Sequence, residues 1–145
     1  MNKGFTLTEI IVTIGIVFIL AGTSWVAIAN YQPTMALNAV ARDLVSDLRL
    51  AQQLSVSEQV NHGVFINLNT NQYQLDKFSA TTETLFVKNL PTSIIFCSIT
   101  GLSNGYATFN PYGSVAFSGG VCLSNTRGQT KNIEIKPSGF VKIQN

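Results

Sequence analysis

Residues 4–29 read GFTLTEIIVTIGIVFILAGTSWVAIA, and this stretch is the strongest structural signal in the chain. Between Ile10 and Ala29, fifteen of the twenty residues are apolar and none is charged. About 20 such residues are enough for a helix to cross the hydrocarbon core of a bilayer. We therefore expect residues 5–29 to form a transmembrane helix, with the basic residue Lys3 keeping the N-terminus in the cytoplasm.

Two simpler interpretations of this stretch have to be weighed. Ala27-Ile28-Ala29 fits the small-residue pattern of a cleaved signal peptide. The apolar run is longer than the usual ~7–15 residues of a signal peptide, however, and Glu9 stands at its start. A generic single-span anchor explains the length of the run but not the glutamate.

The charged residues are few and unevenly distributed along the chain. They make up 11% of 145 residues, against about 25% in an ordinary soluble domain. Only Lys3 and Glu9 lie within residues 1–41. This pattern excludes a plain cytosolic globule, a disordered chain and a multi-span membrane protein. The net charge of +2 is too small to indicate a nucleic-acid-binding protein by itself.

Beyond the apolar run, residues 30–58 are expected to form an amphipathic second half of the helix. Pro33 should kink this helix or briefly break it. Asp43 and Asp47 lie four residues apart, on a face expected to be solvated or to contact a partner. Apolar residues recur at three- and four-residue spacing and predict a stripe that packs on a domain core, namely Leu37, Val40, Ala41, Leu44, Leu48 and Ala51.

Residues 59–145 alternate apolar and polar side chains in short runs, which predicts a β-rich region after the helix. Residues 63–68 and 73–76 flank a turn and predict one hairpin, and residues 133–136 and 140–143 predict a terminal hairpin. Further strands are expected at residues 85–87, 94–96, 106–109 and 115–117. Residues 98–105 and 118–130 are rich in Ser, Gly, Asn and Thr and are expected to be surface loops. One long helix followed by antiparallel strands is an α+β fold.

The N-terminal motif Gly4-Phe5-Thr6-Leu7-Thr8-Glu9, followed at once by the apolar run, resembles the class III signal of type IV pilins and type II secretion pseudopilins. The resemblance implies that residues 1–4 are a leader, that a prepilin peptidase cuts between Gly4 and Phe5, and that Phe5 becomes N-methylated. Gly4 lets an extended backbone lie close to a protease, because it has no side chain.

The same resemblance gives Glu9 a role in filament assembly. Glu9 lies four residues after Phe5, which on a helix puts both on one face. In the family, this glutamate pairs with the amine of the first residue of a neighbouring subunit, here Phe5. A carboxylate at the edge of an apolar span has an unfavourable free energy in the membrane and needs a partner. The alternative is that Glu9 has no role in assembly and only extends to the lipid headgroups.

The C-terminal part is similar to the GspH/FimT group of minor pseudopilins. The similarity lies in residues 41–51, in the turn at residues 109–113, and in Ile133-Glu134-Ile135 followed by Pro137-Ser138-Gly139. It implies the pilin fold, in which the long helix packs on an antiparallel sheet. It also implies a minor subunit of a type II secretion pseudopilus or type IV pilus, at or near the tip, that supports protein secretion or pilus biogenesis. Its expected partners are other pilins and the inner-membrane assembly platform. Its expected location is the bacterial inner membrane, with the C-terminal domain periplasmic or extracellular.

The candidate chemical groups of the predicted β domain are few. Cys97 and Cys122 fall in the part expected outside the cytoplasm, where they either form a disulfide or remain two buried thiols. His62 is expected to be a surface residue at the helix-to-strand junction. We expect no metal, no cofactor, no small-molecule substrate and no catalytic site, because neither ligand spacing nor a nucleophile motif is present.

A DNA-uptake pilin is the alternative function. Four basic residues gather near the C-terminus and are its candidate DNA contacts: Arg127, Lys131, Lys136 and Lys142. DNA-binding members of the FimT group carry a Gly-Arg-x-Arg signature at the last hairpin, where this chain has Gly139-Phe140-Val141-Lys142. Lysine is a poorer match than arginine for phosphate, so a solvated basic hairpin is the competing interpretation.

Overall fold

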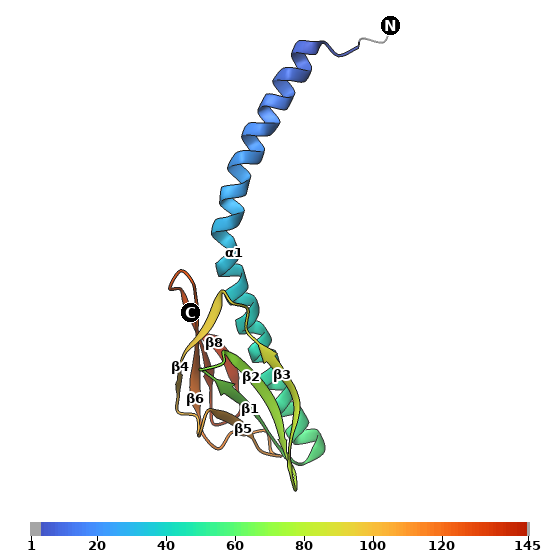
Figure 1. The fold of residues 1–145 in the computed structure, drawn as a ribbon. Coiled ribbons are helices and arrows are strands. Elements are labelled where there is room, and N and C mark those ends of the chain that lie inside the picture. The colour runs from blue at the N-terminus through green and yellow to red at the C-terminus, as the bar shows by residue number, and fades with distance from the viewer. Residues whose placement is uncertain (1–3, 145) are drawn as a thin grey trace. The chain divides into compact units, whose positions relative to one another are not determined.

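The computed structural model describes residues 4–144, and the side chains of residues 23–30 lie outside this description. The chain divides into two compact units, Met1–Pro33 and Thr34–Asn145. A long helix, α1 (Leu7–Glu58), supplies residues to both units, and eight β-strands follow it (Figure 1).

Helix α1 continues through Pro33, so of the two predicted effects, a kink or a brief break, the break is wrong. A proline removes one backbone donor, but the hydrogen bonds on either side can hold the helix when its next turns are packed. From Leu37 onward these turns are anchored in the core of the second unit. The helix ends at Glu58, and Gln59 follows in the left-handed conformation, with φ of 56°, that commonly terminates helices.

The eight strands form two four-stranded antiparallel sheets rather than one. The first sheet has the order β3-β2-β1-β5 and the second has the order β4-β6-β7-β8. The first comprises β1 (Asn61–Asn67), β2 (Gln72–Phe78), β3 (Thr82–Asn89) and β5 (Tyr106–Phe109). The second comprises β4 (Ile94–Thr100), β6 (Gly119–Asn125), β7 (Thr130–Ile135) and β8 (Val141–Gln144).

Both predicted hairpins are confirmed. Strands β1 and β2 pair with Val64 opposite Leu75, and strands β7 and β8 pair with Ile135 opposite Val141. In both hairpins the apolar residues of facing strands therefore point to the same side of the sheet. Pro91, which follows β3, separates it from β4, and the two strands belong to different sheets.

Three predictions for the β region are wrong. Residues 118–130 were expected as a loop but contain β6, an inner strand of the second sheet. Buried and less buried residues alternate along this strand, with Val121, Leu123 and Asn125 buried, but its glycines and serines make this pattern hard to recognise in the sequence. Strand β4 extends to Thr100, into the other expected loop. Residues 115–117 form no strand, because Val115 makes only an isolated bridge to Phe109.

One hydrophobic core unites the helix and both sheets in the second unit. The helix contributes the predicted stripe, of which all but the partly buried Val40 is fully covered. The largest fully buried apolar side chains of the sheets include Leu75, Phe109, Ile94, Leu123, Ile133 and Ile135. The stripe therefore packs on a domain core, as its spacing predicts.

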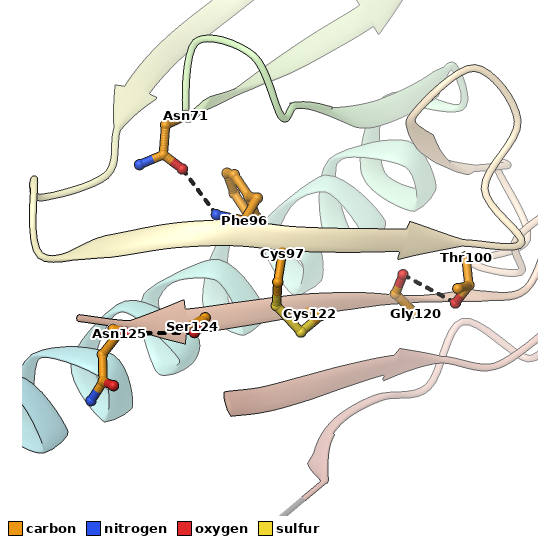
Figure 2. Close-up of a disulfide and its surroundings, with 8 residues drawn as sticks. All are labelled: Asn71, Phe96, Cys97, Thr100, Gly120, Cys122, Ser124 and Asn125. Carbon is orange, nitrogen blue, oxygen red and sulfur yellow. Dashed lines mark hydrogen bonds between the residues drawn. A yellow bond between two sulfur atoms is a disulfide. The ribbon is translucent and has the colours of Figure 1, made fainter. Parts of the chain in front are cut away.

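Polar side chains tie the layers of this core together. The Asn71 side chain, in the β1–β2 turn, accepts a hydrogen bond from the backbone N–H of Phe96 at 2.9 Å (Figure 2). It also donates to the carbonyl oxygen of Ile94 at 2.6 Å, so it joins the first sheet to β4 of the second. On the helix, Gln52 donates from Nε2 to the carbonyl oxygen of Gly113 at 2.6 Å.

Asp47 is buried, which corrects the expectation of a solvated face for Asp43 and Asp47. Its carboxylate accepts hydrogen bonds from the Tyr73 hydroxyl and the Lys88 ammonium, both at 2.6 Å, whereas Asp43 is exposed. Burial and the nearby Asp47 carboxylate raise the pKa of Tyr73. Helix α1 is thereby linked to β2 and β3 by a charge-assisted network.

Candidate functional site

The first candidate site is the start of helix α1. Gly4 and Phe5 precede the helix and are exposed, and the Phe5 side chain is 84% accessible. Because the helix begins only at Leu7, Phe5 does not share a helical face with Glu9 as the four-residue spacing predicted. The leader residues 1–3 lie outside the described part of the chain.

Thr6 and Glu9 form a capping box at this helix start. The backbone N–H of Glu9 lies 3.3 Å from the Thr6 hydroxyl oxygen, and the backbone N–H of Thr6 donates to the Glu9 carboxylate at 3.1 Å. The Thr6 hydroxyl also donates to the same carboxylate oxygen at 3.0 Å. Reciprocal bonds of this kind satisfy backbone donors that a helix start leaves open.

This capping role of Glu9 was not predicted from the sequence, although Thr-x-x-Glu before an apolar run is the signature of a capping box. A carboxylate in the first turn also interacts favourably with the positive end of the helix dipole. Glu9 is therefore neither isolated nor turned away from the chain. The bonds hold its carboxylate at Thr6, the residue directly after Phe5 and thus beside the expected cleavage point between Gly4 and Phe5.

The apolar run that follows has no buried side in its own unit. The large apolar residues between Ile10 and Leu20 are 49–74% accessible, and they face every direction around the helix. A helix that is apolar on all sides needs an apolar environment or other helices around it. Within the described part of the chain, no helix is found that is long and apolar enough to cross a membrane. The end of the expected span, residues 23–29, has side chains outside the description.

The four basic residues proposed to contact DNA are not brought together at one place. Arg127 lies in the β6–β7 turn, whose Gln129 accepts a 2.7 Å hydrogen bond from Thr34 at the start of the second unit. Lys136 lies in the β7–β8 turn, which packs against Gln52 through Gly139. Thr34 and Gln52 are 18 residues apart on α1, or about 27 Å along the helix.

The other two basic residues lie on opposite faces of the second sheet. Lys131 is paired with Leu123, whose side chain points into the core, whereas Lys142 is paired with Glu134 on the outer face. The Lys142 ammonium lies 3.4 Å from the Glu134 carboxylate, so part of its charge is compensated. The sequence cluster is therefore divided between two ends and two faces, which does not favour DNA binding through these residues.

Cys97 and Cys122 are joined in a disulfide, with their Cα atoms 5.2 Å apart (Figure 2). The register of β4 and β6 shifts between Phe96 and Ser98, so Cys97 is the extra residue of a β-bulge. Strand β4 is at the edge of its sheet, and the disulfide attaches this bulge to the inner strand β6. The bond is a structural staple on a strand that has only one neighbour.

His62 is fully buried, which corrects the expectation of a surface residue. Its Nδ1 lies 2.9 Å from the carbonyl oxygen of Val60, and its Nε2 has no hydrogen-bond partner among the described residues. The nearest acid is Glu58, whose carboxylate lies 3.5 Å from Nε2 and 2.7 Å from the Lys77 ammonium. The hydrogen bond from Lys77 lowers the pKa of the Glu58 carboxyl. This cluster fastens the end of α1 to the first hairpin.

Comparison with solved structures identifies the fold. It is similar to that of the minor pseudopilin EpsH from the type 2 secretion system of Vibrio cholerae, with a TM-score of 0.65 and 11% identity over 74% of this chain and 95% of that one. The type IV minor pilin FimU of Pseudomonas aeruginosa matches with a TM-score of 0.59 and 13% identity, over 75% and 88% of the two chains. The chain has the minor-pilin fold. No protein-family model matches the chain, and no curated protein matches its sequence.

The minor-pilin fold confirms the predicted fold class, an N-terminal helix packed on antiparallel sheets. Both similar proteins are filament subunits by name and not enzymes. The helix start and the apolar run contribute no residue to the hydrophobic core, and the large apolar side chains from Ile10 to Leu20 are exposed. These are the parts that the candidate functional site comprises.

Proposed function

We propose that this chain is the precursor of a minor pilin or pseudopilin, a filament subunit held in the bacterial inner membrane until it is assembled. One observation carries the proposal: in the sequence, an apolar helical segment accessible on every side from Ile10 to Leu20 precedes a domain of minor-pilin fold. Such a helix is stabilised in lipid before assembly and among the helices of other subunits afterwards.

Processing is the first step of this function. A prepilin peptidase cuts after Gly4 on the cytoplasmic side and methylates the new amine of Phe5. The exposed, non-helical backbone at Gly4 and Phe5 supports this role, because a protease binds its substrate in an extended form. We expect the mature protein from producing cells to begin at N-methylated Phe5 by mass spectrometry. A mature N-terminus at Asn30 would overturn the proposal in favour of an ordinary cleaved signal peptide.

Assembly is the second step, and Glu9 is its proposed determinant. After cleavage the Phe5 amine is a cation, and in a filament the Glu9 carboxylate of one subunit pairs with the amine of the next. The capping box makes a sharp test available, because glutamine can also accept the bond from the Thr6 backbone. Glu9→Gln removes the charge and keeps the cap, whereas Thr6→Ala removes the hydroxyl part of the cap and keeps the charge.

We expect both variants to be cleaved normally. Glu9→Gln should fail to enter filaments in the presence of the partner subunits, and Thr6→Ala should still assemble. Normal incorporation of Glu9→Gln would rule out charge pairing, and loss of incorporation in Thr6→Ala would show that assembly also needs the helix cap.

The proposed partners are the other subunits of the filament and the assembly platform of the inner membrane, and the folded domain is periplasmic or extracellular. The two similar structures come from a secretion system and from a type IV pilus system, so both machines are candidates. Genes beside the one that encodes this chain discriminate them: secretion ATPase and secretin genes indicate secretion, and competence genes indicate DNA uptake.

A further inference from the structure

A basic groove lies between helix α1 and edge strand β8 of the folded unit. It has a volume of about 350 Å³ and is lined by Arg42, Val45, Ser46, Arg49, Lys142 and Ile143. Three of these six residues carry a positive charge. The groove is separate from the helix start and from the divided basic residues near the C-terminus, except that it includes Lys142.

The helix supplies two of the three charges in a fixed arrangement. Arg42, Ser46 and Arg49 follow each other at spacings of four and three residues, so they lie on one face of α1. Arg49 donates from Nη2 to the carbonyl oxygen of Val141 at 3.2 Å, which orients its guanidinium against β8. No acid in the described part of the chain forms an ion pair with Arg42 or Arg49.

The wall and floor of the groove are partly apolar. Val45 is almost completely buried between the two arginines, and Ile143 packs against the core from β8. Lys142 completes the rim from the strand side. Guanidinium groups recognise carboxylates in a paired geometry, and an apolar surface between them binds an apolar side chain.

We propose that this groove binds a protein segment that carries two carboxylates on either side of an apolar residue. Arg42 and Arg49 are about 10.5 Å apart along the helix, a separation that two acids on one face of a bound segment can match. Lys142 lines the groove from β8, with part of its charge compensated by Glu134, and the surface at Ile143 receives the apolar residue. The partner is an acidic segment of another protein, such as a neighbouring filament subunit.

DNA is the less favourable occupant of the groove. Asp43 follows Arg42 directly, and Glu134 lies 3.4 Å from the Lys142 ammonium, so acids interrupt the positive surface on both sides. A continuous phosphate backbone would meet these acids, whereas two separate carboxylates would not. The partly apolar lining also adds nothing to the binding of phosphates.

Fluorescence anisotropy on the full-length chain in a non-ionic detergent tests the proposal. The probes are a labelled peptide of alternating glutamate and leucine, its glutamine-substituted twin, and a short single-stranded DNA. The groove variant is Arg42→Gln with Arg49→Gln. The matched control is Lys131→Gln with Lys136→Gln, which removes the same charge outside the groove. Thermal unfolding checks that each variant is folded, and Arg42→Gln alone serves if the loss of the Arg49 bond destabilises the chain.

We expect the acidic peptide to bind the wild type and the control with affinities within about twofold, and the groove variant at least about tenfold more weakly. The glutamine twin should not bind. Equal weakening in the control, or no binding of the acidic peptide, would overturn the proposal. Tighter binding of the DNA that is lost in the groove variant would replace it with a nucleic-acid groove. None of these outcomes depends on leader cleavage or on Glu9, so the groove and the proposed function can fail separately.

Discussion

Two turns of the second sheet, one at each end of β7, provide a quantitative test of the packing of the folded unit. Gly139, in the β7–β8 turn, has φ of +79°, and a Cβ atom there would overlap the carbonyl oxygen of Gly113 and the side-chain amide of Gln52. Gly128, in the β6–β7 turn, has a similar φ of +73° but has nothing within 4 Å of its Cβ position. Alanine is therefore destabilised at both sites by the positive φ, and at Gly139 it is destabilised further by the steric overlap.

The expected losses of unfolding free energy follow from these environments. A left-handed conformation costs an alanine about 1–2 kcal/mol, which is the whole effect of Gly128→Ala. Gly139→Ala adds about 1–3 kcal/mol for overpacking. It also costs about 1 kcal/mol for the displaced hydrogen bond from Gln52 to Gly113. At about 4 °C per kcal/mol for a unit of this size, the melting temperature should fall by about 4–8 °C for Gly128→Ala and by about 12–24 °C for Gly139→Ala.

Thermal unfolding of both variants, followed by circular dichroism on the same preparation as the wild type, measures the difference. The comparison is informative because the two substitutions are chemically identical. Equal shifts in melting temperature for the two variants would refute the close approach of Gly139 to Gly113. A shift below about 4 °C for Gly139→Ala would also refute the left-handed conformation of this turn.

Three further outcomes are expected. Cys122→Ser, which opens the disulfide to Cys97 across 25 residues, should lower the free energy of unfolding by about 3.5 kcal/mol in urea titration, and a loss below 1 kcal/mol would contradict a stabilising staple. Asn71→Ala should lower the free energy of unfolding by about 2–4 kcal/mol, because two buried backbone groups of β4 lose their hydrogen-bond partners. Asn71→Gly, which relieves the positive φ, is the control and should be nearly as unstable. Burial and the hydrogen bond to Asp76 raise the pKa of Tyr106 to about 12. The free energy of unfolding should therefore decrease as the pH rises from about 10 to 12. In unfolding experiments at alkaline pH, Tyr106→Phe should show a smaller decrease.

The parts of the molecule that depend on neighbours in the sequence were predictable. The amphipathic half of α1 follows from its three- and four-residue spacing, and the hairpins β1–β2 and β7–β8 follow from alternation around turn residues. The helix start was only partly predicted. Its family motif indicated cleavage and pairing, but the capping box between Thr6 and Glu9 was overlooked although its signature was present.

The parts that depend on contacts between distant residues could be decided only by the tertiary structure. Strand β6 lies in the interior of a sheet because its neighbours β4 and β7 cover it, and its glycine- and serine-rich sequence carries no local sign of this. His62 and Asp47 are buried because the hairpin and the helix close over them.

The arrangement of the charged residues also depends on contacts between distant parts of the chain. In the sequence, Arg127 and Lys136 are close together, but the strand between them carries them to opposite ends of a sheet. Arg49 and Lys142 are far apart in the sequence, yet the packing of β8 beside α1 makes them the two sides of one groove. The apolar helix with its single carboxylate was predictable from residues 4–29 alone, because local periodicity and composition are sufficient for a helix. Which charges act together could be seen only in the folded chain, because that depends on distances through space and not along the sequence.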